Sequence, residues 1–190
     1  MKWRTMFAVA MLAGLEVATM QCDAAPRKSA KTKPEAGKMD GCFKGSDLDL
    51  GIPDDAVFFL AEVSVEGEAM ANRRWFVGPG GEVRFGKNAL PFDFDDLPRK
   101  PFNRPFGNLP VAKVPGAEIE SFVLWLEAEG FFRLPAEVGP PDGLRVQGGV
   151  DRWVVARHAG TTACIRLRPG APLSDAVKSR FMSLIEAHRN

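Results

Sequence analysis

Residues 152 to 157 and 161 to 168 flank a short loop, His158-Ala159-Gly160. Both segments are expected to be strands, and two strands joined by so short a loop run antiparallel. A three-residue loop with Gly160 in the left-handed conformation predicts a bulged hairpin. In that register one face carries Trp153, Val155, Ala163, Ile165 and Leu167, and the other carries Val154, Ala156 and Cys164. The chain is therefore expected to contain an antiparallel sheet.

Three further segments carry strand patterns. Residues 55 to 66 begin apolar and then alternate, with one face formed by Phe59, Ala61, Val63 and Val65. Residues 73 to 77 and 82 to 85 flank the turn Gly78-Pro79-Gly80-Gly81. These segments predict an antiparallel hairpin or meander.

Two segments change to a helical period. The first helix is predicted from Gly116 to Glu129, with Gly130 as its C-terminal stop. The second is predicted from Leu173 to His188. Their apolar stripes are Ile119, Phe122, Val123 and Leu126, continued by Phe131, and Ala176, Val177, Phe181, Leu184 and Ile185.

These elements predict an α+β fold, in which an antiparallel sheet carries two amphipathic helices on one face. In its simplest form the order is strand-strand-helix-strand-strand-helix. With 45% hydrophobic residues and 14 Phe, the chain can form one core of ordinary size. A single domain is expected over residues 51–190.

The segment 87–116 is rich in proline and phenylalanine, and few sheet ladders tolerate such a density of proline. Its aromatic residues indicate an ordered loop. They either form an exposed contact patch or fasten the loop onto the core. On the first interpretation the partner-contact residues are Phe92, Phe94, Phe102 and Phe106.

The first residues have the layout of a secretory signal peptide. Lys2 and Arg4 precede the apolar run Met6 to Leu15, and small residues lie before a cut after Ala24. The run is about half the roughly 20 residues needed to span a bilayer, so a retained anchor is the weaker alternative. A lipoprotein with Cys22 as the acylated residue is a second alternative. The predicted location is secreted or periplasmic, with no integral membrane segment after processing.

Residues 25–50 are expected to form a flexible, basic linker. Lys, Pro, Gly and Ala dominate its first part, and no apolar periodicity is present. Its charge permits weak contact with an anionic surface, but a solvated tether is the preferred interpretation, because the charges are spread along the segment.

Removal of residues 1–24 leaves Cys42 and Cys164 as the cysteines of the mature chain. An even count in an oxidising compartment predicts a disulfide between them. The alternative is a reactive thiol at Cys164, six residues from His158, and it lacks the orienting group that a thiolate nucleophile needs.

The charge balance argues against nucleic-acid binding, because 25 Lys+Arg face 24 Asp+Glu and the net charge is +1. No phosphate-binding glycine loop precedes a helix, and the two histidines have no evident partners. The acidic clusters are Asp93, Asp95 and Asp96, and Asp47, Asp49, Asp54 and Asp55, and neither has the spacing of an EF-hand. No metal, cofactor or catalytic residue is therefore predicted, and the chain is not expected to be an enzyme.

The region Glu118 to His188 carries a helix, the corner Gly130-Phe131-Phe132-Arg133-Leu134-Pro135, a Gly/Pro loop, a hairpin and a closing helix. This pattern resembles the emfourin family of small bacterial proteinase inhibitors and related secreted domains. The resemblance implies an inhibitor-like domain whose partner is a secreted proteinase. The matching corner residues are packing residues, so the resemblance supplies no contact residue. The leader, the linker and the 87–116 insertion depart from the family pattern.

The expected function is an exported module that binds another protein, such as a secreted proteinase or toxin, through loops 87 to 116 and 135 to 151. One alternative is an envelope enzyme that uses scattered carboxylates such as Asp93 to Asp96. Another is a structural envelope protein held near the cell wall by the linker.

Overall fold

The computed structural model describes residues 42–43, 48–91, 99–142, 144 and 146–189. The expected signal peptide, the lipoprotein alternative at Cys22 and the basic part of the linker lie outside these residues. Within the described part of the chain, no helix is long and apolar enough to cross a membrane.

A seven-stranded sheet forms the centre of the fold, with the strand order β4-β3-β2-β1-β6-β7-β5. The strands are β1 (Phe58–Ser64), β2 (Arg73–Val77), β3 (Glu82–Lys87), β4 (Ala112–Lys113), β5 (Glu137–Val138), β6 (Val150–His158) and β7 (Thr161–Leu167). All neighbouring pairs run antiparallel except β5 and β7, which are parallel. The predicted strands are present, and the two-residue strands β4 and β5 were not predicted.

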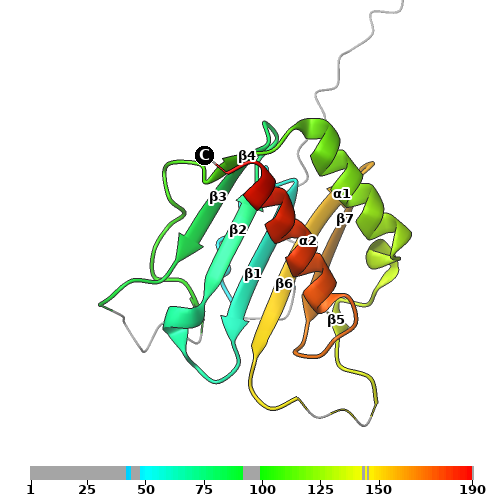
Figure 1. Cartoon of the computed structure of the whole chain (residues 1–190). Coiled ribbons are helices and arrows are strands. Elements are labelled where there is room, and N and C mark those ends of the chain that lie inside the picture. Colours follow the sequence, from blue (N-terminus) through cyan, green and yellow to red (C-terminus); the bar gives the residue numbers. More distant parts are fainter. Residues whose placement is uncertain (1–41, 44–47, 92–98, 143, 145, 190) are drawn as a thin grey trace, which may run out of the picture. The chain divides into compact units, whose positions relative to one another are not determined.

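The helices α1 (Gly116–Ala128) and α2 (Ser174–Ala187) lie on one face of the sheet (Figure 1). The α+β prediction is therefore confirmed. The buried helix residues are Ile119, Phe122, Val123, Leu126, Val177, Phe181 and Ile185. Ala176, expected in the second stripe, is exposed, because it lies on the outer side of α2. Single-turn 3-10 helices follow β1 (Ala69–Ala71) and α1 (Phe131–Arg133).

The start of α2 is joined to the sheet by a buried ionic network. Glu62 and Arg152 face each other on β1 and β6, and Nε of Arg152 lies 2.9 Å from the Glu62 carboxylate. The Arg152 guanidinium also donates to the Ser174 hydroxyl and the Asp175 carboxylate, each at 2.7 Å. Lys178 adds a second cation 2.8 Å from Glu62. These charges fix α2 over the ends of β1 and β6.

The hairpin register differs from the predicted one. His158 pairs with Thr161, so the loop has two residues, Ala159 and Gly160, and both have positive φ (48° and 80°). This is the geometry of a tight turn whose twist matches that of the strands. The shift of one residue moves Cys164 to the face of Trp153 and Val155, and moves Ala163, Ile165 and Leu167 to the helix face. The predicted grouping of these residues was therefore wrong.

The face opposite the helices is also covered. Two distant parts of the chain pack on Phe59, Ala61, Phe76, Trp153 and Val155 of this face. We call the packed residues the cover layer, and they are Cys42, Phe43, Leu48, Leu50, Ile52, Ala56, Phe102 and Phe106. Ordered packing thus begins before residue 51, where the domain was expected to start. The part of the expected linker that includes Leu50, which is 3% exposed, belongs to the fold.

Candidate functional site

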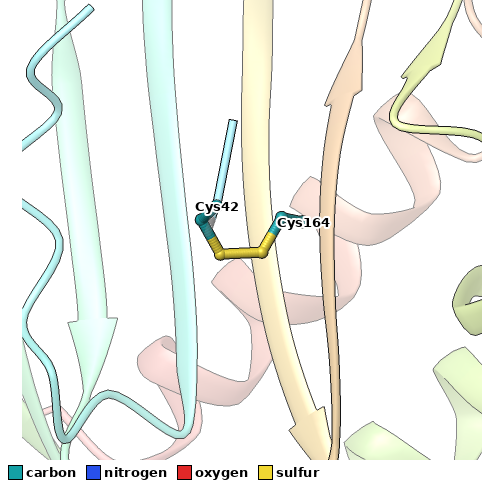
Figure 2. Close-up of a disulfide and its surroundings, with 2 residues drawn as sticks. All are labelled: Cys42 and Cys164. Atoms are coloured by element: carbon teal, nitrogen blue, oxygen red, sulfur yellow. A yellow bond between two sulfur atoms is a disulfide. The ribbon is translucent and has the colours of Figure 1, made fainter. Parts of the chain in front are cut away.

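Cys42 and Cys164 are joined in a disulfide on the covered face of the sheet, with their Cα atoms 5.4 Å apart. Figure 2 shows Cys42 on a segment that lies beside β6, with Cys164 on β7. The next residue, Phe43, packs edge-on against Trp153 at a ring separation of 4.8 Å. Both sulfur atoms are used in the bond, so the pair holds the cover layer and leaves no thiol at Cys164.

Arg74 fastens the described end of the Pro/Phe segment to the sheet. Its guanidinium lies over the rings of Phe102 and Phe106, 4.5 and 4.3 Å from their centroids. It also donates to the carbonyls of Leu50 and Arg104, at 2.6 Å each. Burial lowers the pKa of Arg74 to about 10, and Asp49 opposes this effect.

The two rings therefore belong to the cover layer, as the second interpretation of the segment has it. Phe102 is only 9% exposed, and Phe106 is partly buried, so neither contributes to an exposed patch. Phe92 and Phe94 lie outside the described residues, and their role as contacts stays a prediction.

Asparagine side chains also hold this part of the segment, at Pro101 and Asn103. Asn72 and Asn88 both donate to the carbonyl of Pro101, at 2.9 and 2.8 Å. Asn88 also donates to Ala69, and its side-chain oxygen accepts from the backbone N–H of Asn103. These bonds replace the ladder hydrogen bonds that the prolines remove.

The candidate chemical residues lie only partly within the described part of the chain. Asp93, Asp95, Asp96 and Asp47 lie outside the described residues, and Asp49 accepts a hydrogen bond from the N–H of Gly51. Each histidine has a carboxylate neighbour that was not predicted: His158 lies 3.4 Å from Glu127, and His188 lies 2.9 Å from Glu118. Among the described residues, no three His, Cys, Asp or Glu side chains are grouped to hold a metal ion.

The loops gather at one end of the sheet. Ser64, the last residue of β1, pairs with Val150, the first of β6, and Arg73 pairs with Lys87 at the corresponding ends of β2 and β3. The connections that leave these strands consequently lie at the same end of the sheet (Figure 1, below β1, β6 and β5). We call this surface the loop rim, and it consists of the described residues among 65–72, 88–91, 139–149 and 168–173.

The loop rim holds most of the large apolar side chains that are exposed in the described part of the chain. They are Val65 (50%), Met70 (55%), Leu90 (70%), Leu144 (52%) and Val146 (43%). The others, Leu109 and Leu124, lie elsewhere. Single exposed apolar residues are ordinary on a protein surface, but a gathering of them on adjacent loops is typical of an interaction surface.

A groove of about 500 Å³ lies within the loop rim. Its lining consists of Val65, Glu137, Gly139, Pro140, Leu144, Val146, Gly148, Arg168 and Pro169. The lining residues at Val65, within 139–148 and at Pro169 are apolar or glycine. Glu137 on β5 and Arg168 after β7 are the charged residues of the lining.

Direct contacts between the loops hold the groove in shape. The N–H of Val65 donates to the carbonyl of Gly149 at 3.1 Å. Gly170 has a φ of 77°, and a Cβ there would lie 2.6 Å from the Val146 side chain. Only glycine fits this position, because both its backbone conformation and the packing exclude a side chain. Three connections are thus packed into one surface.

A cluster of four charges closes one side of the groove. Arg168 donates to Glu137 at 2.9 Å, and Arg166 bridges Glu137 and the buried carboxylate of Asp151. The hydrogen bond from Arg168 lowers the pKa of Glu137, and the same bond raises the pKa of Arg168. These ion pairs link the charged residues beside the groove, and the other lining residues are apolar or glycine.

The sequence pointed to only part of this surface. Loop 135 to 151 was predicted as a contact loop, and the turn residues Pro140-Pro141-Asp142 mark it. The contribution of Val65 and Met70 was missed, since Val65 continues the alternation of β1 and was assigned to a strand face. Its exposure follows from β1 ending at Ser64.

A scan against models of known protein families finds no match to this chain, and a search of curated proteins also finds none.

Proposed function

We propose that this chain is an exported binding module that captures another protein through the loop rim. The observation that carries the proposal is the gathering of Val65, Leu144 and Val146 around one groove, while most other large apolar side chains are buried. Loops on a rigid sheet are the usual place for recognition residues.

The groove has the composition of a small contact centre. Val65, Leu144 and Val146 supply apolar lining, and Glu137 and Arg168 add a paired charge to it. In protein interfaces, an apolar centre supplies most of the binding free energy, and a polar margin excludes water from it. We expect the partner to insert an apolar side chain from a protruding loop.

Contacts between the loops order them in the free protein, and this order favours a high binding affinity. The Val65–Gly149 hydrogen bond and the packing around Gly170 restrict the loops that line the groove. A surface that is ordered in the free protein loses less conformational entropy when it binds. Steric occupation by a preformed rim is the mechanism that an inhibitor or a protective partner uses.

Export and the class of partner rest on the sequence and on the disulfide. The Cys42–Cys164 bond is of the kind that persists in oxidising compartments, which agrees with the predicted leader. The resemblance of the 118–188 region to emfourin-type inhibitors makes a secreted proteinase the first partner to test.

The test is capture on immobilised protein from the secreted proteins of the producing cells, together with a panel of secreted bacterial proteinases. Wild type should retain a partner, and the double variant Val65→Glu/Val146→Glu should lose it. Leu124→Glu is the matched control, because Leu124 is similarly exposed (46%) but lies on α1, and it should capture normally. Equal capture by all three proteins, or none by wild type, would contradict the proposal.

A further inference from the structure

Two cations lie side by side at one end of the sheet. Arg73 is the first residue of β2 and Lys87 is the last residue of β3, and the strand register places them directly opposite each other. Directly opposite residues on antiparallel strands have Cβ atoms about 4.5 to 5.5 Å apart. Their side chains are therefore neighbours on one face of the sheet, where two like charges repel each other.

An aromatic pair supports the two cations. Trp75 and Phe85 form the cross-strand pair two residues further along β2 and β3, with ring centroids 5.2 Å apart. Both rings belong to the core on the helix side of the sheet, and side chains two residues apart on a strand share a face. Arg73 and Lys87 therefore lie on that same face, but both are exposed. The packed rings hold the strands that carry the cations in register.

No carboxylate among the described residues neutralises this pair. Glu62 lies opposite Arg73 on β1, but its carboxylate forms ion pairs with Arg152 and Lys178. No described Asp or Glu comes within ion-pair distance of Arg73 or Lys87. The four cations in and beside this cross-strand row thus share Glu62 and one further carboxylate, which pairs with Arg152 at the start of α2. Positive charge is in excess at the β2/β3 end of the row.

We propose that Arg73 and Lys87 form a binding site for a phosphate group. The guanidinium of Arg73 presents N–H donors in a planar fork that matches two phosphate oxygens, and the ammonium of Lys87 adds a point charge with further donors. The charge of a phosphate monoester, about −1.5 to −2 at neutral pH, balances the two cations. A bound phosphate group removes the repulsion between the two side chains, so the unoccupied pair favours binding.

The site is separate from the groove of the loop rim. Neither Arg73 nor Lys87 lines that groove. In the strand order, β2 and β3 lie on one side of β1, and β6, β7 and β5 lie on the other. The phosphate site therefore does not depend on the capture of a protein at the loop rim.

Titration of the full chain with inorganic phosphate, followed by amide chemical shifts, tests the site. We expect saturable shifts at Arg73 and Lys87 that sodium chloride of equal ionic strength does not reproduce. The double variant Arg73→Gln/Lys87→Gln should bind phosphate about tenfold or more weakly. Lys113→Gln/Arg133→Gln is the charge-matched control, because it removes two exposed cations from other parts of the fold, and it should bind phosphate normally.

Sedimentation with phosphatidylglycerol vesicles distinguishes the source of the phosphate group. If the inorganic phosphate titration separates the two double variants, weaker sedimentation of Arg73→Gln/Lys87→Gln than of the control assigns the site to lipid phosphate. Equal sedimentation then assigns it to a free phosphate group. The proposal is overturned if wild type shows no saturable shifts, if chloride gives the same shifts, or if both double variants bind phosphate as wild type does. None of these results bears on capture at the loop rim, so the two proposals fail separately.

Discussion

Val65 and Gly149 are joined by a backbone hydrogen bond of 3.1 Å, although 84 positions separate them in the sequence. The bond closes the gap between the β1–β2 connection and the long loop before β6. It places the exposed Val65 side chain in the wall of the same groove as Leu144 and Val146. Two loops that are distant in the sequence thereby line one groove.

Loss of the disulfide should destabilise the fold substantially. The bond closes a loop with a sequence separation of 122, and chain entropy predicts a contribution of about 3 to 5 kcal/mol. The double variant Cys42→Ser/Cys164→Ser should show this loss in guanidinium unfolding under non-reducing conditions. A reducing agent should shift the wild-type midpoint toward that of the variant and leave the variant unchanged. Equal midpoints for the two proteins would show that the bond does not stabilise the cover layer.

Arg74→Lys should loosen the cover layer while keeping the positive charge. Lysine has no planar group to stack between Phe102 and Phe106, and it cannot serve the carbonyls of Leu50 and Arg104 in the same geometry. We expect a loss of about 1 to 3 kcal/mol in the free energy of unfolding.

Hydrogen exchange should report this change at the backbone amide of Asp49, which lies next to Leu48 and Leu50 and donates to the carbonyl of Arg99. Arg84→Lys is the matched control, because Arg84 also donates to loop carbonyls but bonds to Gly107 and Asn108 instead of Leu50 and Arg104. An exchange rate at Asp49 that is the same in both variants would contradict the role assigned to Arg74.

Glu62→Gln should be among the most damaging single substitutions near α2. Glu62 is 4% exposed and forms ion pairs with both Arg152 and Lys178. Removal of its charge leaves the buried Arg152 guanidinium with the exposed Asp175 carboxylate as its remaining ion-pair partner, at a cost of about 3 kcal/mol. Denaturant unfolding measures this loss. Glu118→Gln, which removes a half-exposed partner of His188, should change the stability by less than about 1 kcal/mol.

Glu137 should contribute to stability in a pH-dependent way. Its pKa in the folded state lies below the ordinary value of 4.5, because Arg168 donates a hydrogen bond to the carboxylate. A carboxylate with a depressed pKa stabilises the fold at pH values above its ordinary pKa of 4.5. This contribution disappears as the pH falls through the lower pKa of the folded state.

The difference in stability between wild type and Glu137→Gln should therefore be present at pH 7 and absent well below pH 4.5. It should stay under about 1 kcal/mol, since the Glu137 side chain is half exposed. Glu186→Gln, which removes an exposed pair with Arg189, is the matched control variant. A difference that grows as the pH falls would contradict this assignment.

Much of the fold could be predicted from periodicity. The strand at 73–77 has the predicted bounds, and both helices agree with their predicted bounds to within a residue at each end. These elements have long, regular apolar patterns. The strands β4 and β5 have two residues each, which is too short for any pattern, and they depend on tertiary pairing.

The hairpin shows where local rules were insufficient. Gly160 was correctly given a positive φ, but Ala159 also adopts one, at 48°, and alanine seldom does. That single unexpected residue shortens the loop from three residues to two and exchanges the faces of β7. The sequence nevertheless predicted the pairing of Cys42 and Cys164, because that inference needed only the cysteine count.

The candidate surface could be predicted only in part. The turn at Pro140-Pro141-Asp142 indicated a contact loop, but exposure of Val65 and Val146 depends on where strands end and which loops meet. The cover layer escaped prediction for a related reason. Its apolar residues before β1, such as Leu48 and Leu50, are few and lie among aspartates, so they indicated a linker.

The central claim is that a partner binds at the loop rim, and hydrogen exchange of the complex with the captured protein tests it most directly. We expect slower exchange at the described amides of 65–72, 139–149 and 168–173, and unchanged exchange rates at the amides of α1 and α2. Slower exchange confined to the helix face, with the loop rim unchanged, would contradict it.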